Sequence, residues 1–213
     1  MKMQNLSPTQ LLTLAVVLII SIVGHEIAHG YIAYKFGDNT AKNAGRLSLN
    51  PLLHVDIIGT ILVPAILYIA GGVIFGWAKP VPINTKTVIQ NGGYKAAILV
   101  SLAGICYNLV LAILSFLLLH FNLAPEYALN FIFMALTINI ILAIFNLYPI
   151  PPLDGSHALG YLARMFGFNG FANFYDSLSK YSLIVIIVII ISPVGEYVFY
   201  PISQILKSII ALI

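Results

Sequence analysis

Apolar runs long enough to cross a membrane constrain this chain more than any other feature of its sequence. Hydrophobic residues make up 60% of its 213 residues and charged residues only 8%, which excludes an ordinary soluble domain. A helix needs roughly 20 apolar residues to cross a bilayer, so the length allows about six spans with short loops. We therefore expect an all-α polytopic membrane protein with about five to six transmembrane helices in a lipid bilayer. The net charge of only +3 and the absence of a basic run argue against a nucleic-acid partner.

Proline, glycine and polar clusters divide the apolar sequence into separate helices. Ser7-Pro8 is a typical helix start, with proline at the first helical position, and Gly37-Asp38-Asn39 is a typical helix end. No internal repeat is present, so we expect one domain over residues 1–213, with a core at about 8–166 and C-terminal helices at 177–213. The expected helices cover residues 8–36, 94–120, 127–146, 154–166, 181–192 and 197–213, the last interrupted at Pro201.

The first apolar helix carries the sequence His25-Glu26-Ile27-Ala28-His29. Residues four apart lie on one face of a helix, so His25 and His29 can bind one metal ion, and imidazole nitrogens suit zinc. Glu26 then lies beside the open position of the metal, where it can take a proton from a bound water and deliver it to a leaving amine. The alternative is a pair of helix histidines that hydrogen-bond to their neighbours. The cost of placing a glutamate and two histidines at membrane depth favours the metal site.

A catalytic zinc takes three protein ligands and keeps one position open, so a third ligand is needed. Among the few acidic residues, Asp154 alone follows a proline-rich break between apolar segments, at residues 149–153. Irregular backbone at membrane depth is tolerated where it lines a cavity, and such a cavity would admit water. We therefore expect His25, His29 and Asp154 to hold one Zn²⁺ per chain, with cobalt and manganese as alternatives. Capping of the following helix is the alternative role for Asp154, and both roles are compatible.

Two further histidines are candidates for supporting roles. His157 lies three residues after Asp154 on the same helical face, where it could assist by donating a hydrogen bond to one of the metal ligands. His54 lies in a polar loop over residues 37–56, and it could be a ligand in some state, a gate, or part of a substrate groove. The alternative, which we favour, is a hydrogen bond from His54 to Asp56.

The order of these motifs resembles the site-2 protease family of intramembrane zinc metalloproteases. The resemblance rests on residues 25–29, on Ala103-Gly104 through Asn108, and on the stretch from Asn146 to Gly155. Residues 50–56 and 76–82 resemble the compact prokaryotic branch, which lacks a PDZ domain. The resemblance implies zinc binding by the three ligands above, with Glu26 as general base. It also implies that Asn108 and Asn146 face the substrate or polarise its carbonyl. Two departures from the family pattern are Ile105 and Ser156, where many relatives have proline and glycine.

Charge predicts how the chain is oriented in the membrane. If residues 57–78 form a re-entrant hairpin bent at Gly71-Gly72, Asp154 reaches the depth of the histidines. The loop over residues 120–126, which contains no Lys or Arg, then lies on the opposite side. By the positive-inside rule the active site lies toward the cytoplasmic side of the cell membrane. In that arrangement one side collects Lys35, Lys42, Arg46, Lys79, Lys86, Lys95, Arg164 and Lys180.

The function expected from these features is that of a membrane-embedded zinc metalloendopeptidase. Its substrate would be a transmembrane protein or peptide, cut in or near a membrane-spanning segment. A helical substrate must unwind before attack, and the non-helical residues 76–82 could pair with the unwound strand by edge addition. The alternatives are a membrane ion transporter whose His and Asp residues line an ion path, and a relative that binds transmembrane helices without cutting them. The intact Glu26 argues against the non-cutting relative.

Overall fold

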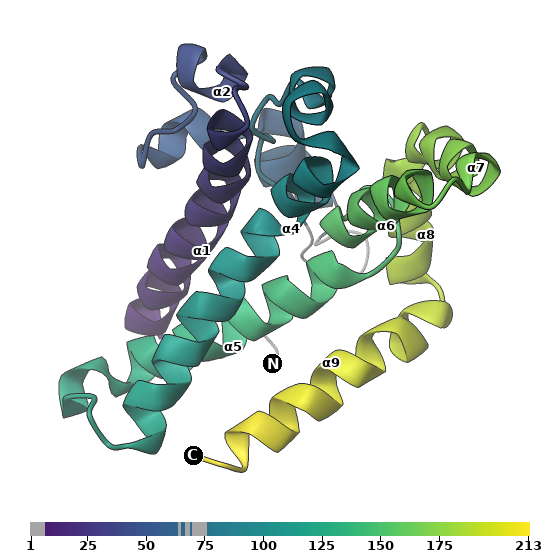
Figure 1. Cartoon of the computed structure of the whole chain (residues 1–213). Coiled ribbons are helices and arrows are strands. Elements are labelled where there is room, and N and C mark those ends of the chain that lie inside the picture. Colours follow the sequence, from purple (N-terminus) through teal and green to yellow (C-terminus); the bar gives the residue numbers. More distant parts are fainter. Residues whose placement is uncertain (1–6, 64, 67–68, 70–75) are drawn as a thin grey trace.

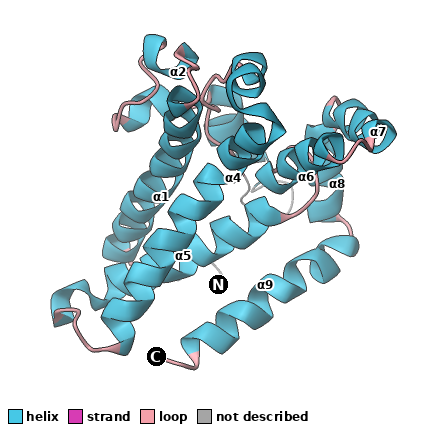
Figure 2. Ribbon diagram, viewed as in Figure 1, coloured by secondary structure: helices cyan, strands magenta, loops and turns pink. Residues whose placement is uncertain are grey.

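Helices joined by loops make up the part of the chain that the computed structural model describes, which is residues 7–213 except 64, 67–68 and 70–75 (Figures 1 and 2). No strand occurs among these residues, which confirms the all-α prediction. Within the described part of the chain, three segments are long and apolar enough to cross a membrane. They are α1 (Pro8–Lys35), α4 (Thr85–His120) and the stretch Glu126–Leu147, which contains η4 (Glu126–Ala128) and α5 (Leu129–Leu147). α4 packs against both α1 and α5.

The predicted count of five to six spans is not confirmed by the described residues. The C-terminal apolar sequence is divided at Pro193 into α8 (Ser182–Ile191) and α9 (Val194–Ile210), and each is shorter than a typical span. The predicted re-entrant bend at Gly71-Gly72 lies outside the described residues.

Both ends of α1 follow from local chemistry. At the start, the Ser7 side chain accepts from the backbone N–H of Gln10, whose side chain accepts in return from the Ser7 N–H. This reciprocal capping box satisfies two helix-end donors. At the end, Gly37 takes a positive φ of 84°, which glycine adopts without steric cost. The observed bounds therefore agree with the predicted helix over residues 8–36.

A buried carboxylate joins the end of α1 to the start of α4. Asp38 is 2% exposed and accepts hydrogen bonds from the backbone N–H and hydroxyl of Thr40 and from the N–H of Asn84. Burial raises the pKa of Asp38, but the hydrogen bonds from Thr40 and Asn84 outweigh it and hold the pKa below its usual value.

The start of α4 was predicted at Tyr94, but the helix begins at Thr85. The Asn84 side chain accepts from the Thr87 N–H and so caps this earlier start. The turn expected at Asn91-Gly92-Gly93 is instead a kink, because only Gly93 leaves the helical conformation, with φ 66° and ψ −169°. A short segment of α4 therefore precedes the long segment that packs between α1 and α5.

The C-terminal half contains a helix that was expected to be a loop. α6 (Asp154–Met165) has its predicted start, and α7 (Asn169–Ser179) occupies most of the predicted loop over residues 167–180. α9 runs through Pro201 without interruption, contrary to the prediction. It packs Leu206 and Ile209 against a buried apolar cluster of α4 and α5.

The proline-rich sequence between α5 and α6 breaks the helix as predicted and is fixed on both sides. The Tyr148 hydroxyl donates to the carbonyl of Val198 in α9, and the Tyr175 hydroxyl in α7 donates to the carbonyl of Pro149 at 2.9 Å. α6 then packs against α4, which places Asp154 near the middle of α1.

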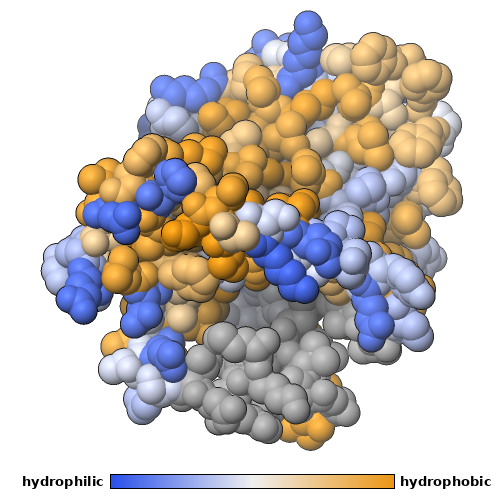
Figure 3. Space-filling model, turned by 90° about the horizontal axis from the view of Figure 1, so that it is seen from below, coloured by the Kyte–Doolittle hydropathy of each residue, from blue (hydrophilic) through white to orange (hydrophobic). Residues whose placement is uncertain are grey.

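Short helical turns occur in the connection between α1 and α4. These are α2 (Thr40–Asn43), the 3₁₀ turn η2 (Pro51–His54) and the π-helical turn η3 (Ile57–Leu62). Large apolar side chains are exposed along the candidate spans, and Figure 3 shows hydrophobic residues over much of the face seen from below. Such a surface suits contact with lipid better than contact with water.

Candidate metal centre

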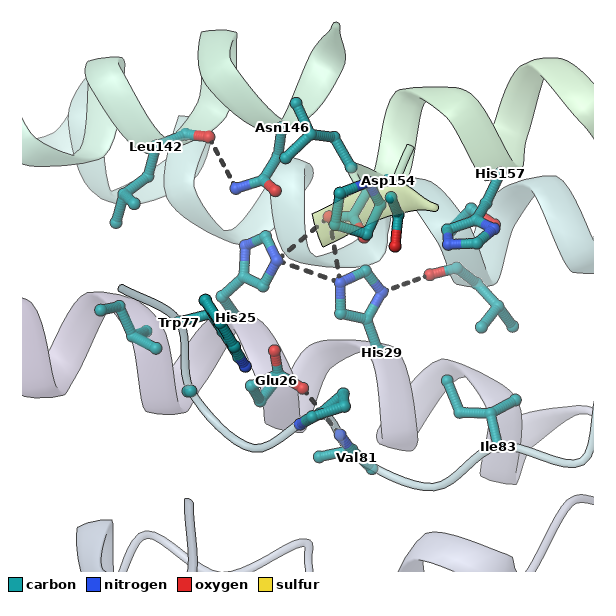
Figure 4. Close-up of a pocket in the computed structure, with 18 of the residues that line it drawn as sticks. His25, Glu26, His29, Trp77, Val81, Ile83, Leu142, Asn146, Asp154 and His157 are labelled. Carbon is teal, nitrogen blue, oxygen red and sulfur yellow. Dashed lines mark hydrogen bonds and ion pairs between the residues drawn. The ribbon is translucent and has the colours of Figure 1, made fainter. Parts of the chain in front are cut away.

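Two histidines of α1 point to one place between α1, α4 and α6 (Figure 4). His25 and His29 are 8% and 7% exposed, and their Nε2 atoms are 3.1 Å apart. They lie one helical turn apart, so the H-E-x-x-H spacing brings both rings to the same face as predicted.

Asp154 completes a triangle with the two histidines. It is the first residue of α6, and its Oδ2 lies 3.1 Å from His25 Nε2 and 3.3 Å from His29 Nε2. This oxygen is buried and has no hydrogen-bond partner among the described residues. His25, His29 and Asp154 are also the group of His, Cys, Asp and Glu side chains in the described part of the chain whose ligand atoms lie close enough for one metal ion.

The hydrogen bonds of the two rings determine which nitrogen faces the centre. His25 Nδ1 lies 2.6 Å from Asn108 Oδ1, and His29 Nδ1 lies 2.7 Å from the carbonyl oxygen of Val100. Both partners accept, so each Nδ1 carries a hydrogen and each ring presents its Nε2 to the centre. The two Nε2 atoms and the Asp154 carboxylate oxygen thus converge in a buried position, and together they form a donor set that could hold a metal ion.

The size of the triangle fits zinc. Tetrahedral zinc with bonds of about 2.0–2.1 Å holds its ligand atoms about 3.3–3.4 Å apart. The observed separations are 3.1, 3.1 and 3.3 Å. α4 leaves the necessary room because Gly104 faces the site, and a Cβ there would lie 2.5 Å from both Nε2 atoms. The donor set and the space therefore fit the ion.

Glu26 lies on the side of the histidines toward the extended segment that precedes α4 (Figure 4). Its Oε2 accepts a hydrogen bond of 2.8 Å from the backbone N–H of Val81. This bond comes from a stretch without helical structure, over residues 76–84. The carboxylate is therefore held beside the candidate metal ligands by a main-chain group, which no side-chain pattern predicts.

Among the described residues, the backbone hydrogen bonds of the extended segment lie along one edge. The N–H groups of Trp77 and Lys79 donate to the carbonyls of Gly59 and His54, at 3.1 and 2.9 Å. The carbonyl of Lys79 accepts from Arg46 at 2.7 Å. Groups two residues apart in an extended chain point to the same side, so Trp77, Lys79 and Val81 form this bonded edge.

The site opens into a cavity of about 560 Å³ between the helices and the extended segment. This volume is within the usual range for a ligand pocket. The lining is mostly apolar, and its polar groups include His25, Glu26, His29 and Asp154. The remaining lining includes Ile22, Trp77, Val88, Leu142, Phe145 and Ile186. Such a cavity suits an apolar polypeptide segment with one polar reacting group.

The two asparagines implied by the family resemblance occupy different positions. Asn146 lines the cavity near the end of α5, and its Nδ2 donates to the Leu142 carbonyl at 3.0 Å. Asn108 is completely buried behind His25 and is absent from the cavity wall. The structure therefore favours a role for Asn108 in orienting His25 over the expected contact with the substrate.

The two further histidines also differ in position. His157 lines the cavity on α6, beyond Asp154 (Figure 4). His54 is 2% exposed and outside the cavity wall, and its Nε2 lies 2.9 Å from the carbonyl oxygen of Ser48. The favoured bond from His54 to Asp56 is wrong, because Asp56 instead caps η3 by accepting from the Gly59 N–H.

Several groups that shape the site were not predicted. They are the Val100 carbonyl, the Val81 N–H and the side chain of Asn139, which accepts from Asn108. The positions of backbone groups cannot be predicted from a pattern of residue types. For Asn139 a signal did exist, since an amide within an apolar span needs a polar partner.

Known proteins match the chain over most of its length. Residues 122–190 match a protein-family model that is described as Peptidase family M50. The protein named "Putative zinc metalloprotease YwhC" of Bacillus subtilis is 38% identical over 205 residues, which cover 88% of this chain and 84% of that protein. "Putative zinc metalloprotease Rip2" of Mycolicibacterium smegmatis is 33% identical over 144 residues, or 66% of this chain and 53% of that protein. Its namesake in Mycobacterium tuberculosis H37Rv is 29% identical over a similar stretch. No solved structure gives a significant match.

Proposed function

The chain belongs to peptidase family M50, and from this premise we propose that it hydrolyses a peptide bond in or near a transmembrane segment of a membrane protein. The resemblance to the site-2 protease family is thereby confirmed, and the chain is a zinc metallopeptidase with helices long and apolar enough to span a membrane. The observation that carries the proposal is the convergence of His25, His29 and Asp154 in the wall of an apolar cavity.

We propose that His25, His29 and Asp154 hold the zinc ion and that Glu26 is the general base. Zinc bound there would supply Lewis acidity toward the scissile carbonyl and would lower the pKa of water. Glu26 would take a proton from the attacking water and return it to the leaving amine. The Val81 N–H keeps the carboxylate in one orientation during both transfers. The apolar wall excludes bulk water, which strengthens each of these interactions.

The substrate strand has a docking edge in the extended segment over residues 76–82. Trp77, Lys79 and Val81 use their backbone groups on the edge facing the protein. The alternation of an extended chain directs the N–H and C=O of Ala78 to the opposite edge. We propose that the unwound substrate pairs with this edge, and that Asn146 contacts its carbonyl from across the cavity.

Charge supports an orientation with the active site toward the cytoplasmic side of the cell membrane. Lys35 ends α1, and Lys42 and Arg46 follow it closely, while residues 120–126 at the other end of α4 contain no Lys or Arg. We propose that residues 1–213 form one domain with five to six membrane segments. Residues 57–78 would form a re-entrant hairpin within it.

The test is a comparison of wild type with Glu26→Gln, each purified in detergent. Zinc per chain is measured for both proteins, together with the cleavage of a panel of transmembrane peptides. We expect about one zinc in both and cleavage by the wild type alone. Absence of zinc from both would refute the metal site. Equal cleavage by the two proteins would refute the role of Glu26, and ion flux in liposomes without cleavage would favour a transporter.

A further inference from the structure

Two buried asparagines lie in line behind His25, one on each of the other two long helices. Asn108 of α4 is 0% exposed and Asn139 of α5 is 1% exposed. Asn108 Oδ1 lies 2.6 Å from His25 Nδ1, and Asn108 Nδ2 lies 2.8 Å from Asn139 Oδ1. A polar side chain at membrane depth is costly unless each of its hydrogen-bonding groups has a partner. These hydrogen bonds therefore connect α1, α4 and α5 through the side chains of His25, Asn108 and Asn139.

The direction of this hydrogen-bond chain is fixed at its far end by a backbone carbonyl. Asn139 Nδ2 donates to the carbonyl of Ala135 at 2.8 Å, and a carbonyl can only accept. The Asn139 oxygen must therefore face Asn108, which must present its Nδ2. A second carbonyl, that of Ser21, accepts from the same Asn108 Nδ2 at 3.2 Å and requires the same orientation.

The last link of the chain acts on His25. Because Asn108 directs its Nδ2 away from His25, its Oδ1 faces the ring and can only accept a hydrogen bond. The His25 hydrogen is thereby held on Nδ1, and the Nε2 lone pair is directed toward Asp154 and His29. For His29, a single backbone carbonyl, that of Val100, accepts from Nδ1 and holds the hydrogen there in the same way.

We propose that Asn139 is a positioning residue of the metal site, which acts through Asn108 to fix the tautomer and orientation of His25. The inference rests on the proposed function, in which His25 is a zinc ligand. Partners of this kind behind a metal-binding histidine contribute about 10–100-fold to metal affinity. The packing of three helices is thus coupled to the affinity for zinc.

The test measures zinc affinity in the full-length chain in detergent, by competition with a chelator. The variants are Asn139→Leu and Asn108→Leu, which keep the number and branching of the side-chain heavy atoms and suit an apolar span. The matched control is Thr137→Val, because Thr137 is also on α5 and donates to a backbone carbonyl four residues earlier, that of Phe133. We expect zinc affinity to fall by about 10–100-fold in both Leu variants and to stay within about twofold in the control.

Two further readouts separate positioning from a merely structural role. Asn108→Asp keeps an acceptor for the His25 Nδ1–H, so we expect it to retain much more zinc affinity than Asn108→Leu. The visible absorption of the cobalt-loaded protein should change in the Leu variants, because it reports the ligand geometry directly. Thermal unfolding of the metal-free variants confirms that they are folded, and Asn139→Ala replaces Asn139→Leu if the larger side chain prevents folding.

The outcomes distinguish the inference from the function on which it rests. If the wild type binds no zinc, the proposed metal site fails. If the wild type binds zinc and the Asn139 variant binds it equally well with an unchanged cobalt spectrum, the role of Asn139 is refuted while the metal site stands. Loss of affinity in Asn108→Leu alone would also refute the role of Asn139.

Discussion

Substitution of Gly104 by alanine tests the metal centre without changing any candidate ligand. Gly104 lies on α4 directly against the two histidine rings. A Cβ at this position would lie 2.5 Å from both Nε2 atoms and 2.5 Å from His25 Cε1. A single methyl group would therefore fall where the two nitrogens approach each other. The substitution should abolish tight zinc binding.

The magnitude follows from the distances. Ordinary van der Waals contact begins at 3.4 Å, so the rings or the helices must separate by about 0.9 Å to accept the methyl group. Metal–ligand distances tolerate only about 0.2 Å of change. The rings cannot retreat freely, because Asn108 and the Val100 carbonyl hold their Nδ1 atoms. We expect zinc affinity to fall by at least about 100-fold, which corresponds to about 2.8 kcal/mol.

The assay is zinc competition against a chelator, with thermal unfolding of the metal-free protein as the check on folding. Gly160→Ala in α6 is the matched control, because a Cβ at Gly160 has no atom within 4 Å. Both variants place alanine in a helix, where it is intrinsically favoured over glycine by about 1 kcal/mol. Wild-type zinc affinity in a folded Gly104→Ala protein would refute the proposed geometry of the centre.

Three further outcomes follow from the structure. Glu26→Gln should retain zinc and lose at least about 100-fold in peptide cleavage, the usual contribution of a general base, and equal turnover would contradict its role. The Asp38 carboxylate has a folded-state pKa below its unfolded value, so its contribution to stability is complete above about pH 4 and is lost as the pH falls through the folded pKa. The difference in melting temperature between wild type and Asp38→Asn should therefore shrink on acidification, and a difference that grows would contradict this. Cysteines introduced at Lys42 and Lys79 should react with an impermeant reagent from the same face of the membrane, and labelling from opposite faces would refute the orientation.

The sequence predicted the helices where local chemistry decides their ends. The bounds of α1 followed from Ser7-Pro8 and Gly37, and the start of α6 followed from the prolines before Asp154. The start of α4 was missed because Asn91-Gly92-Gly93 has the composition of a turn. In the fold, packing against α1 keeps this stretch helical and only Gly93 departs from it.

The candidate site was predictable to the extent that it consists of costly side chains. A glutamate, two histidines and an aspartate are energetically costly among apolar residues, so their presence there indicates a functional site. The groups that hold Glu26 and His29 in place were harder to predict, because the Val81 N–H and the Val100 carbonyl belong to the backbone. Which way Asn108 faces depends on the register between α4 and α1, and this register is a property of the packed helices.

The distance along the chain between the candidate ligands has a consequence for biosynthesis. His25 emerges from the ribosome in the first helix, and Asp154 follows about 130 residues later, at the start of α6. At usual translation rates this interval is on the order of 10 s. During that time α1 exists with two of the candidate ligands and the candidate general base but without the third ligand. The proposed metal centre is therefore incomplete until Asp154 has been synthesised.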